Sequence, residues 1–113
     1  MGRVTYAPAH GDIVWLDFDV TRGHEQAGRR PALVISDTTF NTHFYLTFVC
    51  PITSRRRGHA FEVALHGTQT KGVVLAHQVR TIDVRGRRVR FVEKALPEDI
   101  EIVIDLVSRI LGR

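Results

Sequence analysis

Two short segments of the sequence carry residues whose types and spacing are suited to binding a phosphate. The first is Gly23–Pro31 (GHEQAGRRP), a polar loop that ends on a predicted strand. The second is Pro51–Ser54 (PITS), the end of an apolar strand that runs into three arginines, residues 55–57. If these two strands are antiparallel neighbours, Arg30 and Thr53 meet at one rim of the sheet. An arginine beside a hydroxyl under a loop is suited to a phosphate; a surface arginine and a strand-capping threonine are the alternative.

The cationic side chains of the chain are mostly arginines. Lys and Arg number 16 against 12 Asp and Glu, which gives a net charge of +4 and a pI near 10.0, and Lys71 and Lys94 are the only lysines. The planar guanidinium matches phosphate oxygens and can stack on bases, although many basic domains bind nothing anionic. If the chain binds nucleic acid, the expected phosphate track consists of Arg22, Arg29, Arg55, Arg56, Arg57 and Lys71. A second group is either another basic patch or a solvated turn: Arg85, Arg87, Arg88 and Arg90.

The hydropathy pattern predicts one mainly β domain over residues 1–113. Short apolar or alternating runs, separated by turn residues every eight to twelve positions, are typical of a barrel or sandwich. Residues 19–29 read as a long mobile loop, and residues 38–43 as a turn or a single helical turn. The predicted strands are 12–18, 30–36, 44–53 (buried on both faces), 61–65, 73–79, 80–84 and 89–92.

The C-terminal segment changes from strand to helix periodicity. Apolar residues recur at helical spacing from Ile100 to Leu111. Pro97 suits the first helical position, and Leu96 stands where a capping hydroxyl is expected. The pattern therefore predicts a small, strongly bent antiparallel sheet closed by one amphipathic helix.

Several site types are not expected from the composition. Cys50 is the only cysteine and lies in an apolar run, so a buried small residue is favoured over a nucleophile. The histidines His10, His43, His59 and His66 show no metal-ligand spacing, and we expect neither a metal nor a cofactor. The sequence has no run of 18 apolar residues and no signal-peptide core, which favours a soluble, cytoplasmic protein without a membrane association.

The motifs, taken in order, resemble the MazF family of toxins (MazF/PemK-like endoribonucleases of type II toxin–antitoxin systems). The similarity covers essentially the whole chain, including the closing helix. Any one motif is weak, but the ordered set is specific. The segments that carry it are Gly11–Asp19 (GDIVWLDFD), Gly23–Pro31, Ala32–Ser36 (ALVIS), Pro51–Ser54, Phe61–Val63 (FEV) and Gly72–Asp83 (GVVLAHQVRTID).

The resemblance implies a fold, an assembly and an activity. The fold is an SH3-like barrel of antiparallel strands with a C-terminal helix, of the CcdB/MazF/Kid kind, and the assembly is a homodimer. The activity is sequence-specific cleavage of single-stranded RNA, such as mRNA, without a metal, held in check by an acidic MazE-like antitoxin. In the family's motifs the arginine and the threonine that match Arg30 and Thr53 are catalytic. The neighbouring motif residues implied at the RNA site are Glu25, Gln26, Ser54 and Gln78.

The chain departs from the family pattern at three places. Members commonly have Asp where this chain has His77, many lack His24, and the pair Arg29–Arg30 is not general. These departures bear on the target sequence and the loop contacts more than on the reaction.

Without a metal, RNA is cut most easily by its own 2′-hydroxyl, which attacks the adjacent phosphorus. Arg30 is expected to neutralise the phosphorane and Thr53 to donate to one of its oxygens. Arginine is a poor general base, so His24 and Glu25 are candidate bases, or else solvated loop residues. Two alternatives stay open at this point: a CcdB-like gyrase inhibitor, and a basic RNA-binding barrel without catalysis.

Overall fold

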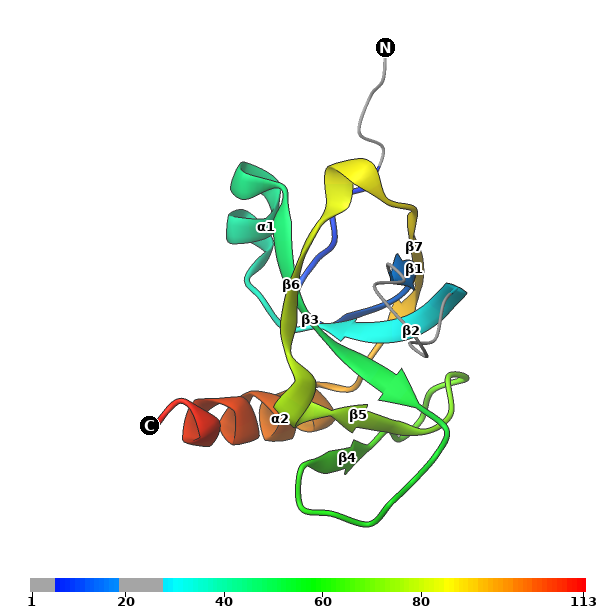
Figure 1. Cartoon of the computed structure of the whole chain (residues 1–113), viewed down its shortest axis with the longest axis vertical. Helices are drawn as coiled ribbons and strands as arrows, with labels where there is room; N and C mark the ends of the chain where they lie inside the picture. Colours follow the sequence, from blue (N-terminus) through cyan, green and yellow to red (C-terminus); the bar gives the residue numbers. More distant parts are fainter. Residues whose placement is uncertain (1–5, 19–27) are drawn as a thin grey trace, which may run out of the picture.

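A mainly antiparallel sheet followed by a C-terminal helix makes up the structure (Figure 1). The computed structural model describes residues 6–18 and 28–113. Its elements in chain order are β1 (Asp12–Phe18), β2 (Gly28–Val34), α1 (Thr38–Phe44), β3 (Leu46–Thr53), β4 (Glu62–Ala64), β5 (Val73–Leu75), the 3₁₀ turn η1 (Ala76–Gln78), β6 (Arg80–Asp83), the 3₁₀ turn η2 (Val84–Gly86), β7 (Val89–Lys94) and α2 (Pro97–Ile110).

The long strand β3 organises the sheet. The strand order is β4-β5-β3-β2-β1-β7, and β6 also pairs with β3. The first half of β3 pairs with β6, its middle with β2, and its last two residues with β5, all antiparallel. The antiparallel sheet with a C-terminal helix predicted from the sequence is confirmed. The strand order ends at β4 and at β7, so closure into an SH3-like barrel stays a prediction.

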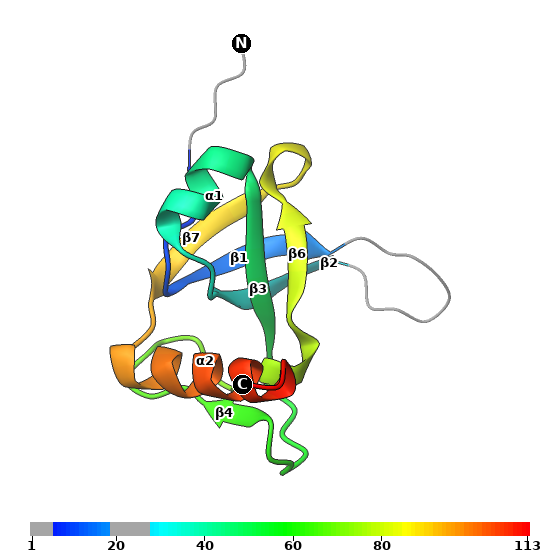
Figure 2. The same cartoon turned by 90° about the vertical axis from the view of Figure 1, so that its left-hand side faces the viewer.

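The core consists of two apolar clusters, one on each face of the sheet. Successive residues of a strand point to opposite faces, and accordingly Ile13 belongs to one cluster and Val14 to the other. The first cluster includes Ile100 and Val103 of α2, which lies across one end of the sheet (Figure 2). Burial on both faces explains why the central strands read as nearly continuous apolar runs.

The helix α1 corrects the predicted start of the third strand. The Asp37 carboxylate accepts the Thr39 N–H at 2.9 Å as an N-cap, and the helix ends at Tyr45, whose φ is +59°. The strand consequently begins at Leu46 rather than Phe44. The expectation that this strand is buried on both faces is wrong at Phe48, which is 40% exposed, because its side chain lies beside Phe40 of α1 at the surface.

The run predicted as a strand over 73–79 is a strand only as far as Leu75. Ala76–Gln78 forms the turn η1, in which Ala76 is buried while His77 and Gln78 are exposed. The β2 strand lies at Gly28–Val34 instead of 30–36. The helix α2 agrees with the prediction, with Pro97 in its first turn and no side-chain cap from Leu96.

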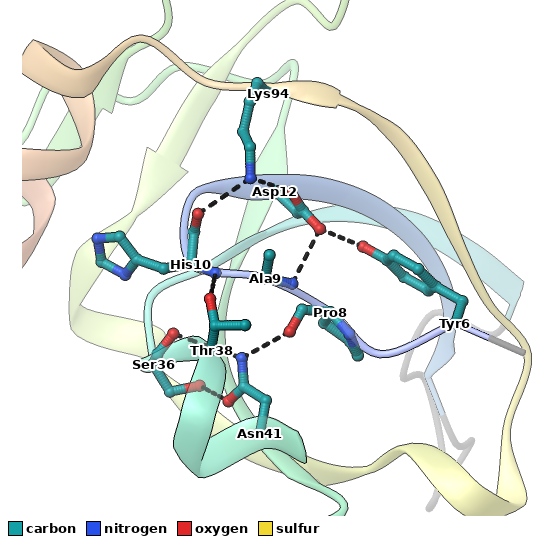
Figure 3. A network of polar contacts seen from close by, with 9 residues as sticks. All are labelled: Tyr6, Pro8, Ala9, His10, Asp12, Ser36, Thr38, Asn41 and Lys94. Atoms are coloured by element: carbon teal, nitrogen blue, oxygen red, sulfur yellow. Dashed lines mark hydrogen bonds and ion pairs between the residues drawn. The ribbon is translucent and has the colours of Figure 1, made fainter. Parts of the chain in front are cut away.

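A buried carboxylate and a buried amide attach residues 6–10 to the rest of the fold. Asp12 of β1 accepts hydrogen bonds from the Tyr6 hydroxyl and from Lys94 of β7, and Asn41 of α1 donates to the Pro8 carbonyl (Figure 3). Burial and the neighbouring Asp12 carboxylate raise the pKa of the Tyr6 hydroxyl. Residues 6–10 are thereby fixed across three elements. Among the described residues, no helix is long and apolar enough to cross a membrane.

Candidate active site

Strand register brings the two candidate catalytic residues to the same rim. Ala32 of β2 pairs with Pro51 of β3, and continuing this register by two residues sets Arg30 opposite Thr53. Both side chains line one open pocket of about 510 Å³. The geometric expectation from the sequence, that these two residues meet at one rim, is confirmed. The other residues that line this pocket are Ser54, Arg55, Arg57, His59, Glu62, Leu75 and Gln78.

The hydroxyl of Thr53 is oriented by the chain that follows it. Its Oγ1 accepts the Arg55 backbone N–H at 3.1 Å. A hydroxyl has one proton to donate besides its acceptor sites, so an oxygen that already accepts can still donate into the pocket. The Thr53 hydroxyl is therefore suited to donate its proton to an anionic oxygen bound in the pocket.

Gly72 allows the β4–β5 hairpin to pack against the end of β3. Its φ is +127°, and a Cβ at this position would lie 2.2 Å from the Thr53 carbonyl oxygen and 2.8 Å from its carbonyl carbon. The next residue, Val73, pairs with Thr53 across the sheet. The position of Thr53 therefore depends on a residue that has no side chain and tolerates a positive φ.

Arg30 and Arg29 have different surroundings because neighbouring residues of a strand point to opposite faces. The Nε of Arg29 lies 3.6 Å from an Asp17 carboxylate oxygen on β1, and Arg29 does not line the pocket. Within residues 6–18 and 28–113, no side chain forms a hydrogen bond or ion pair with the Arg30 guanidinium. Arg30 can therefore direct its full charge toward a ligand.

Glu62 holds the arginine-rich loop in a fixed shape. Its two carboxylate oxygens accept the backbone N–H groups of Arg57 at 2.8 Å and Gly58 at 2.9 Å, and its side chain is only 6% exposed. Burial acts to raise the pKa of this carboxyl, but the two backbone amides and the Arg56 charge outweigh it and lower the pKa. Arg55 and Arg57 consequently line the pocket, whereas Arg56 does not.

His59 forms part of the pocket wall beside Glu62. Its Nδ1 accepts the Phe61 N–H at 3.3 Å, and its Nε2 lies 3.6 Å from a Glu62 carboxylate oxygen. Its ring packs edge-to-face against His77, with centroids 4.7 Å apart. Sequence reasoning missed His59 and Glu62 as pocket residues. The available signals were the Phe61–Val63 motif and the position of His59 two residues after the last of the three arginines.

The remaining predicted site residues divide into three groups. Ser54 and Gln78 line the pocket. Lys71 does not; it follows a loop that is bound to Glu93. Burial acts to raise the pKa of Glu93, but hydrogen bonds from Thr70 and Gln69, together with the Lys71 charge, lower it. The residues that lie outside the described part of the chain are Arg22, His24, Glu25 and Gln26.

The second basic group is partly occupied by protein contacts. Arg85 forms an ion pair with Asp83 at 2.8 Å and lies over the Tyr45 ring. Arg87 donates to the Asp17 carbonyl at 2.8 Å. With two of its arginines engaged, this group resembles a structured turn more than a free anion site.

The described residues offer neither a reactive cysteine nor a cluster of metal ligands. Cys50 is fully buried, as predicted, and burial raises the pKa of its thiol to about 12. A thiolate nucleophile at this position would need an accessible, acidified sulfur. In the described ranges, no three His, Cys, Asp or Glu side chains gather in a way that could hold a metal ion.

Comparisons with known proteins give a consistent assignment. Residues 9–111 match the family model described as PemK-like, MazF-like toxin of type II toxin–antitoxin system. The endoribonuclease toxin MazF of Escherichia coli (strain K12) is 37% identical over 107 residues, covering 95% of this chain and 96% of that protein.

Solved structures agree with the sequence comparison. The crystal structure of MazF (Form-I) from Deinococcus radiodurans superposes with a TM-score of 0.87 at 41% identity, covering 96% of this chain and 100% of that one. The crystal structure of MazE-MazF (Form-II) from the same organism also gives 0.87 at 41% identity, covering 96% and 98%. The family model, the sequence identity and the superposed fold lead to one conclusion: the chain belongs to the PemK-like, MazF-like toxins of type II toxin–antitoxin systems.

Proposed function

We propose that this protein is an endoribonuclease toxin that cleaves single-stranded RNA, such as mRNA, at specific sequences and without a metal. The observation that carries the proposal is the pocket that Arg30 and Thr53 share with Arg55 and Arg57. The activity in the name of the Escherichia coli relative supports it. Arginines around a hydroxyl are suited to binding a phosphodiester. A gyrase inhibitor does not require such a site.

In the proposed reaction the substrate supplies its own nucleophile. The 2′-oxygen forms a bond to the adjacent phosphorus and loses its proton to a base, while the bond to the 5′-oxygen breaks and that oxygen takes up a proton. The products are a 2′,3′-cyclic phosphate and a 5′-hydroxyl. Arg30 stabilises the charge on the non-bridging oxygens, and the Thr53 hydroxyl donates to one of them. His24 and Glu25 are the proposed candidates for proton transfer.

The other contacts to RNA follow from the pocket wall. Arg55 and Arg57 bind the phosphates on either side of the cut, and Ser54 and Gln78 offer hydrogen bonds to sugar or base. Because Arg29 is paired with Asp17, it contributes less to this track than the sequence alone suggests. The target sequence is then set by the pocket wall more than by the phosphate contacts.

The proposed assembly is a homodimer regulated by an acidic MazE-like antitoxin. A Deinococcus radiodurans relative has been crystallised as MazE-MazF, and a cationic pocket attracts a carboxylate-rich peptide. Tyr45 is 41%, Ile102 49% and Leu111 72% exposed, which is apolar surface that a second copy can cover. Closure of the sheet into an SH3-like barrel belongs to the same proposal.

A single 2′-deoxy substitution in the substrate tests the reaction. Placed on the nucleotide 5′ to the cut, it should stop cleavage while binding weakens little, because affinity comes mostly from phosphates. The unsubstituted RNA should yield cyclic-phosphate and 5′-hydroxyl ends in EDTA as readily as in magnesium. Undiminished cleavage of the deoxy strand would refute the mechanism. If the protein leaves RNA uncut and inhibits DNA supercoiling, the gyrase-inhibitor alternative is favoured instead.

A further inference from the structure

We propose that His59 is a stacking platform for a nucleobase next to the scissile phosphate and thereby helps to set the nucleotide preference. This inference rests on the proposed cleavage of RNA and adds a specificity-determining residue to the same pocket. It concerns the face of the imidazole ring, not its proton.

Both ring nitrogens of His59 lie close to groups of the protein itself. Nδ1 accepts the Phe61 N–H, so the neutral ring carries its proton on Nε2, the nitrogen that lies 3.6 Å from the Glu62 carboxylate. Both nitrogens thus have groups of the protein itself as neighbours. The side chain is 40% exposed and lines the pocket, and an exposed aromatic ring is a surface on which a base of single-stranded RNA can stack.

The ring is also held in place before any ligand binds. His77 packs against it at an interplanar angle of 88°, and Phe61 lies next to both histidines. Glu62, which faces Nε2, is itself fixed by the Arg57 and Gly58 amides. A side chain that is 40% exposed yet already oriented loses little conformational entropy on stacking.

The position of the ring places a base beside a bound phosphate. His59 lines the same pocket as Arg30, Thr53 and the two loop arginines. A nucleotide whose phosphate is held by these groups has its base within reach of the pocket wall. Because a purine has a larger stacking face than a pyrimidine, we expect a purine to be preferred at this position.

Two variants of the same position separate stacking from proton transfer. His59→Phe keeps an aromatic face and removes both nitrogens, whereas His59→Leu keeps apolar bulk and removes the aromatic face. We expect kcat/KM of the phenylalanine variant to stay within about threefold of the parent, since stacking is retained, and that of the leucine variant to fall roughly five- to a hundred-fold. Equal loss in both variants, with one limb of the pH profile missing, would overturn the proposal.

An abasic substrate identifies the base that stacks. Removing the base at each nucleotide around the cut in turn should slow the parent enzyme most at one position, and His59→Leu should suffer no further loss there. His10→Leu is the matched control, because the hydrogen bonds of His10 to Thr38 and Lys94 are made by its backbone. Equal sensitivity of parent and His59→Leu at every position would contradict stacking on His59.

Binding measurements distinguish failure of this inference from failure of the proposed function. Fluorescence anisotropy with uncleavable 2′-O-methyl oligonucleotides of adenine or of uracil reports stacking without catalysis. If the parent protein cleaves RNA but His59→Leu keeps its activity and preference, the inference fails alone. If the parent does not cleave RNA, the proposed function fails, and the inference, which rests on it, fails with it.

Discussion

Replacement of Gly72 by alanine tests whether the end of β3 depends on the absence of a side chain. The added Cβ would lie 2.2 Å from the Thr53 carbonyl oxygen, more than 1 Å short of ordinary contact at 3.4 Å, and the backbone φ is +127°. Overpacking costs about 1–3 kcal/mol, and a positive φ costs an L-residue about 1–2 kcal/mol. The free energy of unfolding should therefore fall by about 2–5 kcal/mol.

The effect on stability is measured as a melting temperature. For a domain of this size about 1 kcal/mol corresponds to ~4 °C, so Gly72→Ala should melt about 8–20 °C lower than the parent. At a temperature where the variant is folded, RNA cleavage should fall on the order of a hundred-fold, since a displacement of about 1 Å at Thr53 misaligns the proposed donor.

Two other glycines separate the collision from the backbone strain. Gly58 has a φ of +81° with no atom within 4 Å of a built Cβ, and Gly86 has neither a positive φ nor a neighbour. Gly58→Ala should therefore show only the smaller cost of the backbone, about 1–2 kcal/mol, and Gly86→Ala almost none. A melting temperature for Gly72→Ala equal to that of Gly86→Ala would refute the reasoning.

Three further outcomes follow from other parts of the structure. Arg30→Ala should abolish cleavage with little change in melting temperature, because no described side chain pairs with Arg30; full activity would exclude it from the site. Arg85 lowers the pKa of Asp83 from 3.8 to about 2, so the ion pair stabilises the fold above about pH 4 and this contribution is lost as the pH falls toward 2. Asp83→Asn should therefore lower the melting temperature at pH 7 and not at pH 2, and an equal difference at both would contradict the pairing. Because burial raises the pKa of Cys50 to about 12, iodoacetamide at pH 8 should modify the thiol in guanidinium only; rapid labelling of the native protein would disprove its burial.

The β1 strand, the amphipathic α2 helix and the convergence of Arg30 with Thr53 were predictable from the sequence. Each depends on a pattern within a short segment or on the simple geometry of two antiparallel strands. Two apolar runs are long enough to be recognised as buried strands. Their ends mark the position of Arg30 after the polar segment and of the hydroxyl at the end of β3. The family motifs added roles to these positions.

Other features depended on contacts between distant segments. The apolar run at 73–79 reads as a strand, yet it turns at Ala76 and thereby brings Gln78 to the pocket. The sequence motifs already singled out Arg30, but they also placed Arg29 on the phosphate track. Arg29 lies opposite Asp17 and beside its carboxylate, and only the packed sheet sets this contact.

The wall of the pocket was the least predictable part. His59 and Glu62 come together with Arg30 because the loop after β3 folds back on β4, and the Glu62 carboxylate binds two backbone amides of that loop. A short loop has no hydrophobic periodicity, so its conformation is set by hydrogen bonds to residues several positions away. Sequence alone therefore determined which two strands carry the proposed chemistry, while the tertiary structure decided which side chains surround it, because pocket neighbours are set by contacts that no local pattern encodes.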